Sequence, residues 1–325
     1  MKYATLAFIS LTALAITSGC KSSPINEDIP EPVLRAPALT AAHNAFLETD
    51  YVTMGKRIRD VMSDARVDQM AKDNARELLE RGYEATGGKL PADWALPAGF
   101  EPMAYRQVRT ETPDGPRLRV RLDGRVDDVK RIKSMKLFRG AELLLDMQGT
   151  GSKWFAGAPD TDGMIYYSLD SRDLPAFPEP GILTLQLVMT NGSVTEGWFI
   201  NDKLASSASA FITEPHDSDT LKTGHPTVKW LPFRSPEAAN YERRGLIMWL
   251  SRREDDGTYS NPWKSFGTSP DRTEARLGAG GEGSPDVDLP NGDYILDLVY
   301  DESRRFGPMS LVRRSTRFLT FHITR

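Results

Sequence analysis

Cysteine is almost absent from this chain: among its 325 residues, Cys20 is the only cysteine. A disulfide within the chain is therefore excluded, and any folded core must rest on buried apolar surface, at about 25 cal/mol per Å². Histidine is nearly as scarce, and no two of the four histidines stand at the close spacing that common zinc motifs use. We therefore expect neither a metal site nor another cofactor.

An excess of charge of either sign is also missing. The chain has 41 lysines and arginines against 45 acidic residues, which gives a net charge of -4. This charge is too small to attract polyanions to the whole protein, so we expect no nucleic-acid partner. The hydrophobic content of 39% is that of an ordinary folded protein, and the length allows two or three compact domains.

Catalytic signatures are missing as well, including the Gly-x-Ser-x-Gly elbow of many hydrolases. Residues 278–283 satisfy Gly-x-Gly-x-x-Gly, but Ser-Pro-Asp follows them instead of a helix, so we predict a flexible loop. Residues 160–163 and 254–257 end in Asp-Gly and lack the register of an EF-hand, so we predict turns and not calcium sites. We therefore expect no catalytic residue.

The first residues lack an apolar run of the roughly 20 residues that cross a bilayer as a helix. Residues 3–16 are mostly apolar, follow Lys2 and lead into Thr17-Ser18-Gly19-Cys20, which is typical of a secretory signal peptide. Around Cys20 the chain resembles bacterial lipoproteins, whose lipobox places small residues before an invariant cysteine. Thr17 departs from the usual leucine of that motif. The alternative is an ordinary secretory peptide with a stray cysteine.

The lipoprotein resemblance implies both a modification and a location. Residues 1–19 would be removed as a signal peptide, and Cys20 would carry a diacylglyceryl thioether and an acylated amine, with palmitate among the acyl chains. Lys21 follows the cysteine, and in this family a residue other than Asp there favours the outer membrane. Because two or more acyl chains hold a protein stably at a bilayer, we expect a lipid-anchored protein of the outer membrane.

A tether and a helical segment follow. Residues 20–40 contain four prolines and no periodic apolar pattern, so we predict an extended tether. Within residues 41–100 apolar side chains recur at the helical period, with a break at Ser63-Asp64 and a stop at Gly87-Gly88. This pattern predicts a helical hairpin and a connector. We expect the hairpin to stack on the β domain that follows it; the alternative is a helical platform for a partner.

The remainder has the period of β-strands and an internal repeat. Residues 181–189 and 292–300 share the pattern Gly-x-[Leu/Tyr]-x-Leu-x-Leu-Val at an offset of 111 residues, with an apolar residue at every second position. At similar offsets, Met135-x-Leu137-x-Arg139 matches Met248-x-Leu250-x-Arg252, and Trp154 matches Trp263. The repeat predicts a duplicated β domain, and the alternative is two unrelated sandwiches.

We therefore predict a mainly β protein with one sandwich at residues 101–205, a linker at 206–224 and a second sandwich at 225–325. The second domain resembles fibronectin type III and immunoglobulin-like sandwiches. In that pattern Trp230 is the early-strand tryptophan, and Tyr294 is the tyrosine corner, whose hydroxyl bonds to backbone upstream. The fold class this implies is two immunoglobulin-like or fibronectin III-like β-sandwich domains preceded by a short α-helical hairpin.

The segment 303–325 is rich in arginine and contains no acidic residue. In a hairpin at a sheet edge, its guanidiniums would cluster and bind the carboxylate or phosphate of an anionic glycan or an acidic envelope protein. The alternative is that these charges only prevent pairing between sheet edges. The candidate residues are Arg304, Arg305, Arg313, Arg314 and Arg317.

These features predict a membrane-anchored lipoprotein of the cell envelope that acts as a non-enzymatic binding or assembly module for protein or glycan. One alternative is a glycan- or peptidoglycan-directed enzyme with an unrecognised carboxylate site, which a concave pocket with two facing carboxylates would favour. Another is a structural spacer, which would have neither a pocket nor an apolar patch. A surface of aromatic and arginine side chains would favour binding.

Overall fold

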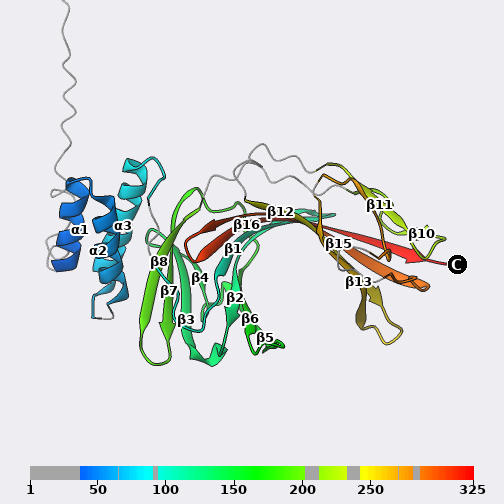
Figure 1. The fold of residues 1–325 in the computed structure, drawn as a ribbon, viewed down its shortest axis with the longest axis horizontal. Helices are drawn as coiled ribbons and strands as arrows, with labels where there is room; N and C mark the ends of the chain where they lie inside the picture. The colour runs from blue at the N-terminus through cyan, green and yellow to red at the C-terminus, as the bar shows by residue number, and fades with distance from the viewer. Residues whose placement is uncertain are drawn as a thin grey trace, which may run out of the picture.

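The computed structural model describes residues 37–325, apart from residues 65, 91–93, 202–211, 233–241, 270 and 281–285. The predicted signal peptide, Cys20 and most of the predicted tether therefore lie outside the described residues. The described chain is mainly β, with a helical segment first and sandwich-like sheets after it, as Figure 1 shows. This arrangement confirms the predicted fold class.

α-Helices occur only at the beginning of the described chain, and they are α1 (Pro37–Leu47), α2 (Tyr51–Ser63) and α3 (Gln69–Ala85). The predicted break at Ser63-Asp64 is confirmed, because α2 and α3 are separate helices on either side of it. Each begins at an aspartate: Asp50 accepts a hydrogen bond from the Thr53 amide at 3.0 Å, and Asp68 accepts one from the Ala71 amide at 2.8 Å. Such N-caps satisfy amides that the helix itself leaves unpaired.

The helix α1 corrects two predictions, the two-helix hairpin and the tether that extends to residue 40. Pro37 is the first residue of α1, where a missing N–H costs nothing because no helical partner exists for it. Leu39, Ala42 and Ala45 are buried against the other helices. The prolines before and within this segment obscured its apolar period.

The predicted first domain contains eight strands. These are β1 (Met103–Thr112), β2 (Gly115–Val126), β3 (Ile132–Arg139), β4 (Glu142–Asp146), β5 (Ser152–Pro159), β6 (Ile165–Ser171), β7 (Gly181–Met189) and β8 (Val194–Asn201), with a short 3-10 turn, η3 (Val129–Arg131), before β3. Strands β4-β3-β7-β8 form one sheet in that order, and β1-β2-β6-β5 face it from a second sheet. The core between them is the larger apolar cluster.

Eight further strands follow, and they are β9 (Ile212–Glu214), β10 (Asp219–Leu221), β11 (Thr227–Trp230), β12 (Arg243–Arg253), β13 (Tyr259–Thr268), β14 (Glu274–Arg276), β15 (Gly292–Phe306) and β16 (Met309–Ile323). Strands β9 and β10 lie within the segment predicted as a linker, which is therefore not simply a connection. They are only three residues long, too short to show a strand period. Strands β14-β11-β9 form a small sheet that covers β12, β15 and β16.

The two halves repeat the same strand order. The order β4-β3-β7-β8 in the first half corresponds to β13-β12-β15-β16 in the second, and β1-β2-β6 corresponds to β9-β11-β14. The register agrees too: Met135 pairs with Leu187, and Met248 pairs with Leu298, which is 111 residues after Leu187. This agreement supports the predicted duplication. The match of Trp154 with Trp263 is wrong, because they lie on the non-equivalent strands β5 and β13.

The helices pack on the outer side of the sheet β4-β3-β7-β8 (Figure 1). Ile182 of β7 and Trp198 of β8 belong to the apolar core of the helices. Gly55 of α2 leaves room for the Trp198 ring, since a Cβ atom at Gly55 would lie 3.0 Å from it. The helical segment thus stacks on the first β domain, as expected.

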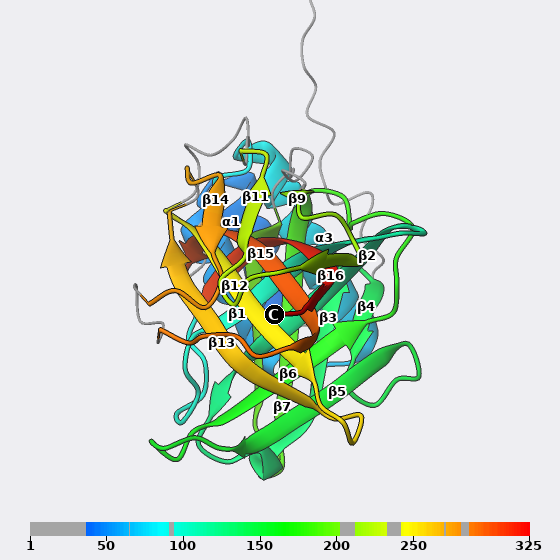
Figure 2. The same ribbon diagram turned by 90° about the vertical axis from the view of Figure 1, so that its right-hand side faces the viewer.

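One sheet runs through both halves of the molecule, because β16 pairs in parallel with β1. The resulting sheet has nine strands, with β13-β12-β15-β16-β1-β2-β6-β5 in order and β10 beside the end of β16. The predicted sandwiches therefore have separate cores but share a sheet. Figure 2 shows its two edge strands, β13 and β5, with the second half of the molecule toward the viewer.

The long hairpin β15 and β16 contributes to both cores. On β16, Met309 and Leu311 lie in the first core, whereas Leu319 and Phe321 lie in the second. The pairing of β15 with β16 has no register shift, so all odd-numbered side chains of β16 lie on one face. No described helix or sheet packs on the opposite face, which lies on the inside of the bend of the sheet in Figure 1. We call this surface the open face.

The predicted tyrosine corner is present. The Tyr294 hydroxyl donates to the carbonyl oxygen of Pro290 at 2.7 Å, and the Tyr294 ring stacks on Phe321. Trp230 is buried in the same core. In the part of the chain that the structure describes, no helix is both long and apolar enough for a membrane crossing.

Candidate functional site

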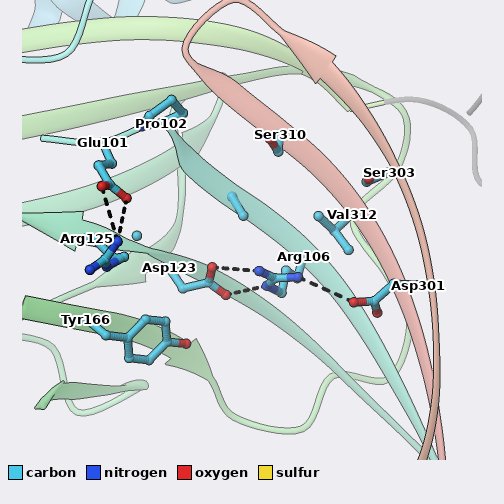
Figure 3. A pocket seen from close by; sticks show the side chains of 12 residues that line it. Glu101, Pro102, Arg106, Asp123, Arg125, Tyr166, Asp301, Ser303, Ser310 and Val312 are labelled. Atoms are coloured by element: carbon cyan, nitrogen blue, oxygen red, sulfur yellow. Dashed lines mark hydrogen bonds and ion pairs between the residues drawn. The ribbon is translucent and has the colours of Figure 1, made fainter. Parts of the chain in front are cut away.

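A hollow of about 380 Å³ lies on the open face, where β1, β2 and β6 meet the β15–β16 hairpin. Figure 3 shows charged side chains of β1, β2 and β15 converging there, with a tyrosine of β6 at one side. The lining residues are Glu101, Pro102, Ala104, Arg106, Asp123, Gly124, Arg125, Tyr166, Asp301, Ser303, Ser310 and Val312. Strand alternation directs these side chains away from both cores.

Arg106 is the centre of this hollow and lies between two carboxylates. It contacts Asp123 of the neighbouring strand twice, with Nε to Oδ2 at 2.5 Å and Nη2 to Oδ1 at 3.0 Å. Its Nη1 atom lies 3.8 Å from Asp301 Oδ2 on the far hairpin. Burial lowers the pKa of Arg106, but hydrogen bonding to Asp123 and the charges of Asp123 and Asp301 raise the pKa above its ordinary value. Arg106 is therefore a fixed cation that joins the two halves of the sheet.

Arg314 extends this row along the hairpin. Its Nε and Nη2 atoms contact the two carboxylate oxygens of Asp301 at 2.8 and 2.6 Å, a bidentate pair. Asp301 is therefore paired with both Arg106 and Arg314. The hollow is therefore lined by a row of alternating charges that hold one another in place.

Arg125 closes the other end of the hollow. Its Nη1 atom contacts Glu101 at 3.2 Å, and its Nη2 atom contacts both Asp162 oxygens at 2.6 Å. The acidic turn at residues 160–163 therefore binds an arginine of the chain itself. Gly163 has φ +80° at this turn, and Gly257 has φ +81° at the turn between β12 and β13 in the second half, which confirms the prediction of turns.

Tyr166 supplies an aromatic surface beside the charged row. Its side chain is 36% exposed, and its ring centroid lies 6.4 Å from that of Phe155, which is 55% exposed. Burial and the charge of Asp123 raise the pKa of Tyr166, so its hydroxyl stays protonated and able to donate near neutral pH. The two rings offer apolar faces next to fixed polar groups, a combination common to binding sites.

The carboxylates of this site are each engaged by an arginine. Asp123 and Asp301 lie on opposite sides of Arg106 and do not face one another across an empty space. Among the described residues, no group of histidine, cysteine and acidic side chains is arranged to hold a metal ion. The arrangement can orient a ligand by hydrogen bonds and by ring contacts.

The arginines predicted from the last segment do not form one cluster. Their hairpin lies inside the sheet, since β15 pairs with β12 and β16 pairs with β1, so the premise of an edge hairpin is wrong. Arg313 is buried with Glu302 on the core face, and Arg314 pairs with Asp301 on the open face. Anion binding by the predicted set Arg304, Arg305, Arg313, Arg314 and Arg317 stays a prediction.

Arg304 and Arg305 line a separate hollow of about 400 Å³ near the connector that follows α3. Arg304 is partly buried there, which lowers its pKa, whereas Arg305 is exposed. Arg317 is partly buried on β16. The lipidation residue Cys20 lies outside the described residues, so its modification also stays a prediction.

Sequence reasoning missed the residues that meet in the open face. The alternation of Arg117, Arg119 and Arg121 with apolar residues predicted a strand with a polar side, and this polar side is part of the open face. Arg106 and Asp301 stand 195 residues apart, and only the parallel pairing of β1 with β16 brings them together. No local sequence pattern predicts that pairing.

Comparison with known proteins finds no matching family model and no similar curated protein. Among solved structures, the N-terminal Ig1-2 module of the Drosophila receptor protein tyrosine phosphatase DLAR has a TM-score of 0.30 and 8% identity, over 72% of this chain and 100% of that one. Dpr2 Ig1-Ig2 in complex with DIP-Theta Ig1-Ig3 has a TM-score of 0.26 and 14% identity, over 72% and 99%. The fibronectin(III)-like modules of Clostridium thermocellum CbhA have a TM-score of 0.21 and 8% identity, over 71% and 94%. None of these similarities identifies a function.

Proposed function

We propose that this chain is a lipoprotein of the cell envelope, held at the outer membrane through Cys20, and that it is a non-enzymatic module whose open face binds a protein or a glycan. The observation that carries the binding role is the position of Arg106, fixed between Asp123 and Asp301 beside the exposed ring of Tyr166. Such preorganised polar groups next to an aromatic surface favour recognition, because little ordering remains to be done on binding.

The same geometry weighs against the two alternatives. A glycan-directed enzyme needs an acid and a base that face each other across the bond to be cleaved. Here an arginine occupies the space between the two aspartates of the hollow. A plain spacer needs no hollow lined by charged groups and no exposed aromatic pair, yet the open face has both.

A photo-crosslinking amino acid tests the binding surface in intact cells of the native host. Placed at Tyr166 on the open face, it should yield discrete crosslinked products or attachment to the glycan sacculus. Placed at Leu143 of β4, which is 46% exposed on the other sheet, it should yield neither. Equal products from both positions would contradict the assignment of the open face.

The anchor is tested separately by Cys20→Ser. Because the substitution removes the sulfur that would be acylated, the protein should move from the membrane pellet to the soluble periplasmic fraction. A protein that stays in the membrane fraction would show that something other than lipid on Cys20 holds it there.

A further inference from the structure

A second feature of the open face lies in the other half of the sheet, away from the hollow. Asp297 of β15 is directly opposite Trp249 of β12 on one side and directly opposite Phe318 of β16 on the other. Residues directly opposite on neighbouring strands have Cβ atoms about 5 Å apart. One carboxylate is thus flanked by two aromatic side chains, and Phe318 is 44% exposed.

The carboxylate of Asp297 is not satisfied by its surroundings. Its Oδ1 atom is buried and has no hydrogen-bond partner among the described residues. Burial raises the pKa of Asp297 to about 6, and no arginine or lysine counteracts this effect. Most buried carboxylate oxygens in folded proteins are paired, so an unpaired one is unusual in a folded protein.

The charged groups nearest to Asp297 leave its charge uncompensated. On the same strand and face, Asp293 and Asp301 stand four residues before and after it, and they pair with His322 and Arg314 of β16 and not with Asp297. On β13, Lys264 is opposite Trp249, so Trp249 separates it from Asp297. Lys264 instead places its Nζ atom 5.2 Å from the ring centroid of Phe266.

The neighbouring ring contacts show how this surface holds a cation. Phe266 is 42% exposed, and its centroid lies 6.2 Å from that of Trp249 at a steep angle. The ammonium of Lys264 over Phe266 is a cation–π contact within the molecule. Next to it, Trp249 and Phe318 present similar rings together with a negative charge, which Phe266 lacks.

We propose that Asp297, Trp249 and Phe318 form a site for one cationic side chain, an arginine or a lysine, of a partner protein. Charge complementarity argues for this occupant: a carboxylate attracts the cation, and the flanking rings favour it through their negative faces. Arginine fits best, because its planar guanidinium both pairs with a carboxylate and stacks on an aromatic ring.

The inference rests on the proposed role of the open face as a binding surface and names a protein as its partner. It uses none of the residues that line the hollow around Arg106, so each can fail alone. If crosslinks at Tyr166 are absent but Asp297 binds a cation, the cation site is supported and the binding role of the hollow is not. If crosslinks at Tyr166 form but Asp297 binds no cation, only the binding role of the hollow is supported.

A small arginine compound provides the probe. N-acetyl-argininamide is titrated into the protein that lacks residues 1–36, and binding is followed by calorimetry and by saturation-transfer NMR at pH 7.5. N-acetyl-citrullinamide, which has the same shape but no charge, is the matched ligand control. We expect the arginine compound to bind, and we expect the dissociation constant of the citrulline compound to be at least about tenfold higher.

Protein variants locate the site. Asp297→Asn should weaken binding of N-acetyl-argininamide at least about tenfold, because the amide keeps the shape but removes the charge. Asp293→Asn is the matched control, since it removes one exposed carboxylate from the same strand and face, and it should bind as the unaltered protein does. Circular dichroism checks that both variants are folded.

Two results would overturn the proposal. One is equal affinity of Asp297→Asn and the unaltered protein for the arginine compound, which would exclude the carboxylate as the partner. The other is tight binding of choline without binding of the arginine compound, which would assign the site to a quaternary ammonium ligand. Weaker binding of the arginine compound at pH 5 than at pH 7.5 in the unaltered protein, but not in Asp297→Asn, would further support it.

Discussion

Arg76 of α3 donates to Glu196 of β8, and this ion pair joins the helical segment to the first sandwich. The Nε to Oε1 distance is 3.0 Å, and the two side chains are 1% and 0% exposed. Glu196 also accepts from Gln186 Nε2 at 3.0 Å, and the Arg76 guanidinium lies over the Phe138 ring. The helices are therefore a structural part of the β unit and not a loosely attached platform.

Replacing only one residue of the Arg76–Glu196 pair should lower the free energy of unfolding more than replacing both. Arg76→Met leaves the Glu196 carboxylate buried without its cation, so we expect the free energy of unfolding to fall by about 3 kcal/mol. Burial already raises the pKa of Glu196 although Arg76 opposes this. The double variant Arg76→Met with Glu196→Leu should recover most of the loss. Urea denaturation of the unaltered protein, the two single variants and the double variant measures these free energies of unfolding. A double variant less stable than either single variant would contradict the prediction.

The tyrosine corner gives a second stability prediction. Tyr294→Phe removes the hydroxyl that donates to Pro290 and leaves the ring in place on Phe321, so we expect a loss of about 1 to 2 kcal/mol. Tyr259→Phe is the control, because Tyr259 is 55% exposed and should change the denaturation midpoint little. Equal midpoints for Tyr294→Phe and the unaltered protein would show that the hydrogen bond of the Tyr294 hydroxyl does not stabilise the fold.

Asp297 should make stability depend on pH in an unusual direction. Burial raises its pKa to about 6, whereas an unfolded chain has a value of about 4. Between about pH 4 and pH 6 the unfolded chain releases a proton that the folded chain keeps, so rising pH favours unfolding through this group. Its contribution to stability is therefore present below about pH 4 and lost above about pH 6.

The comparison of variants isolates this effect from other carboxylates. We expect the free energy of unfolding of Asp297→Asn minus that of the unaltered protein to rise by about 1 kcal/mol between pH 4 and pH 7, a value reduced for solvent screening. A difference that stays constant with pH for Asp297→Asn would mean that burial does not perturb this group.

Local patterns made the strands and the corner predictable, whereas long-range pairings did not. Tyr294 bonds to Pro290, only four residues earlier, and the apolar residues at every second position, which include Leu296 and Leu298, indicate one buried face. The join between the halves depends on Met103 and Met309 standing side by side. Because the hydrogen bonds of a strand are made by its backbone, its side chains carry no signal for which distant strand it pairs with.

The charge of the last segment illustrates the same limit. Its lack of acidic residues is a true property of residues 303–325, yet the acids that neutralise it come from just before it on β15. Asp301 is opposite Arg314 and Glu302 is opposite Arg313 in the hairpin register. Composition counted along the chain therefore overstated the charge that the folded surface presents.

The shared hairpin predicts that damage in the second half of the chain reaches the first core. Met309 belongs to the strand β16 but is fully buried in the first core, whereas Leu319 of the same strand is buried in the second. We expect Met309→Ala to cost about 2 to 4 kcal/mol, mostly by leaving a cavity. Amide hydrogen exchange should then speed up in β2 and β3, far away in the sequence, more than in β11.

The matched variant Leu319→Ala should give the opposite distribution, with faster exchange in β11 and β14. Both substitutions remove one large apolar side chain from the same strand and face, so a difference between them reports which core each side chain supports. If both variants accelerate exchange only in the second half, then β16 stabilises the second core alone. The parallel pairing of β1 with β16 would in that case be too weak to couple the sandwiches.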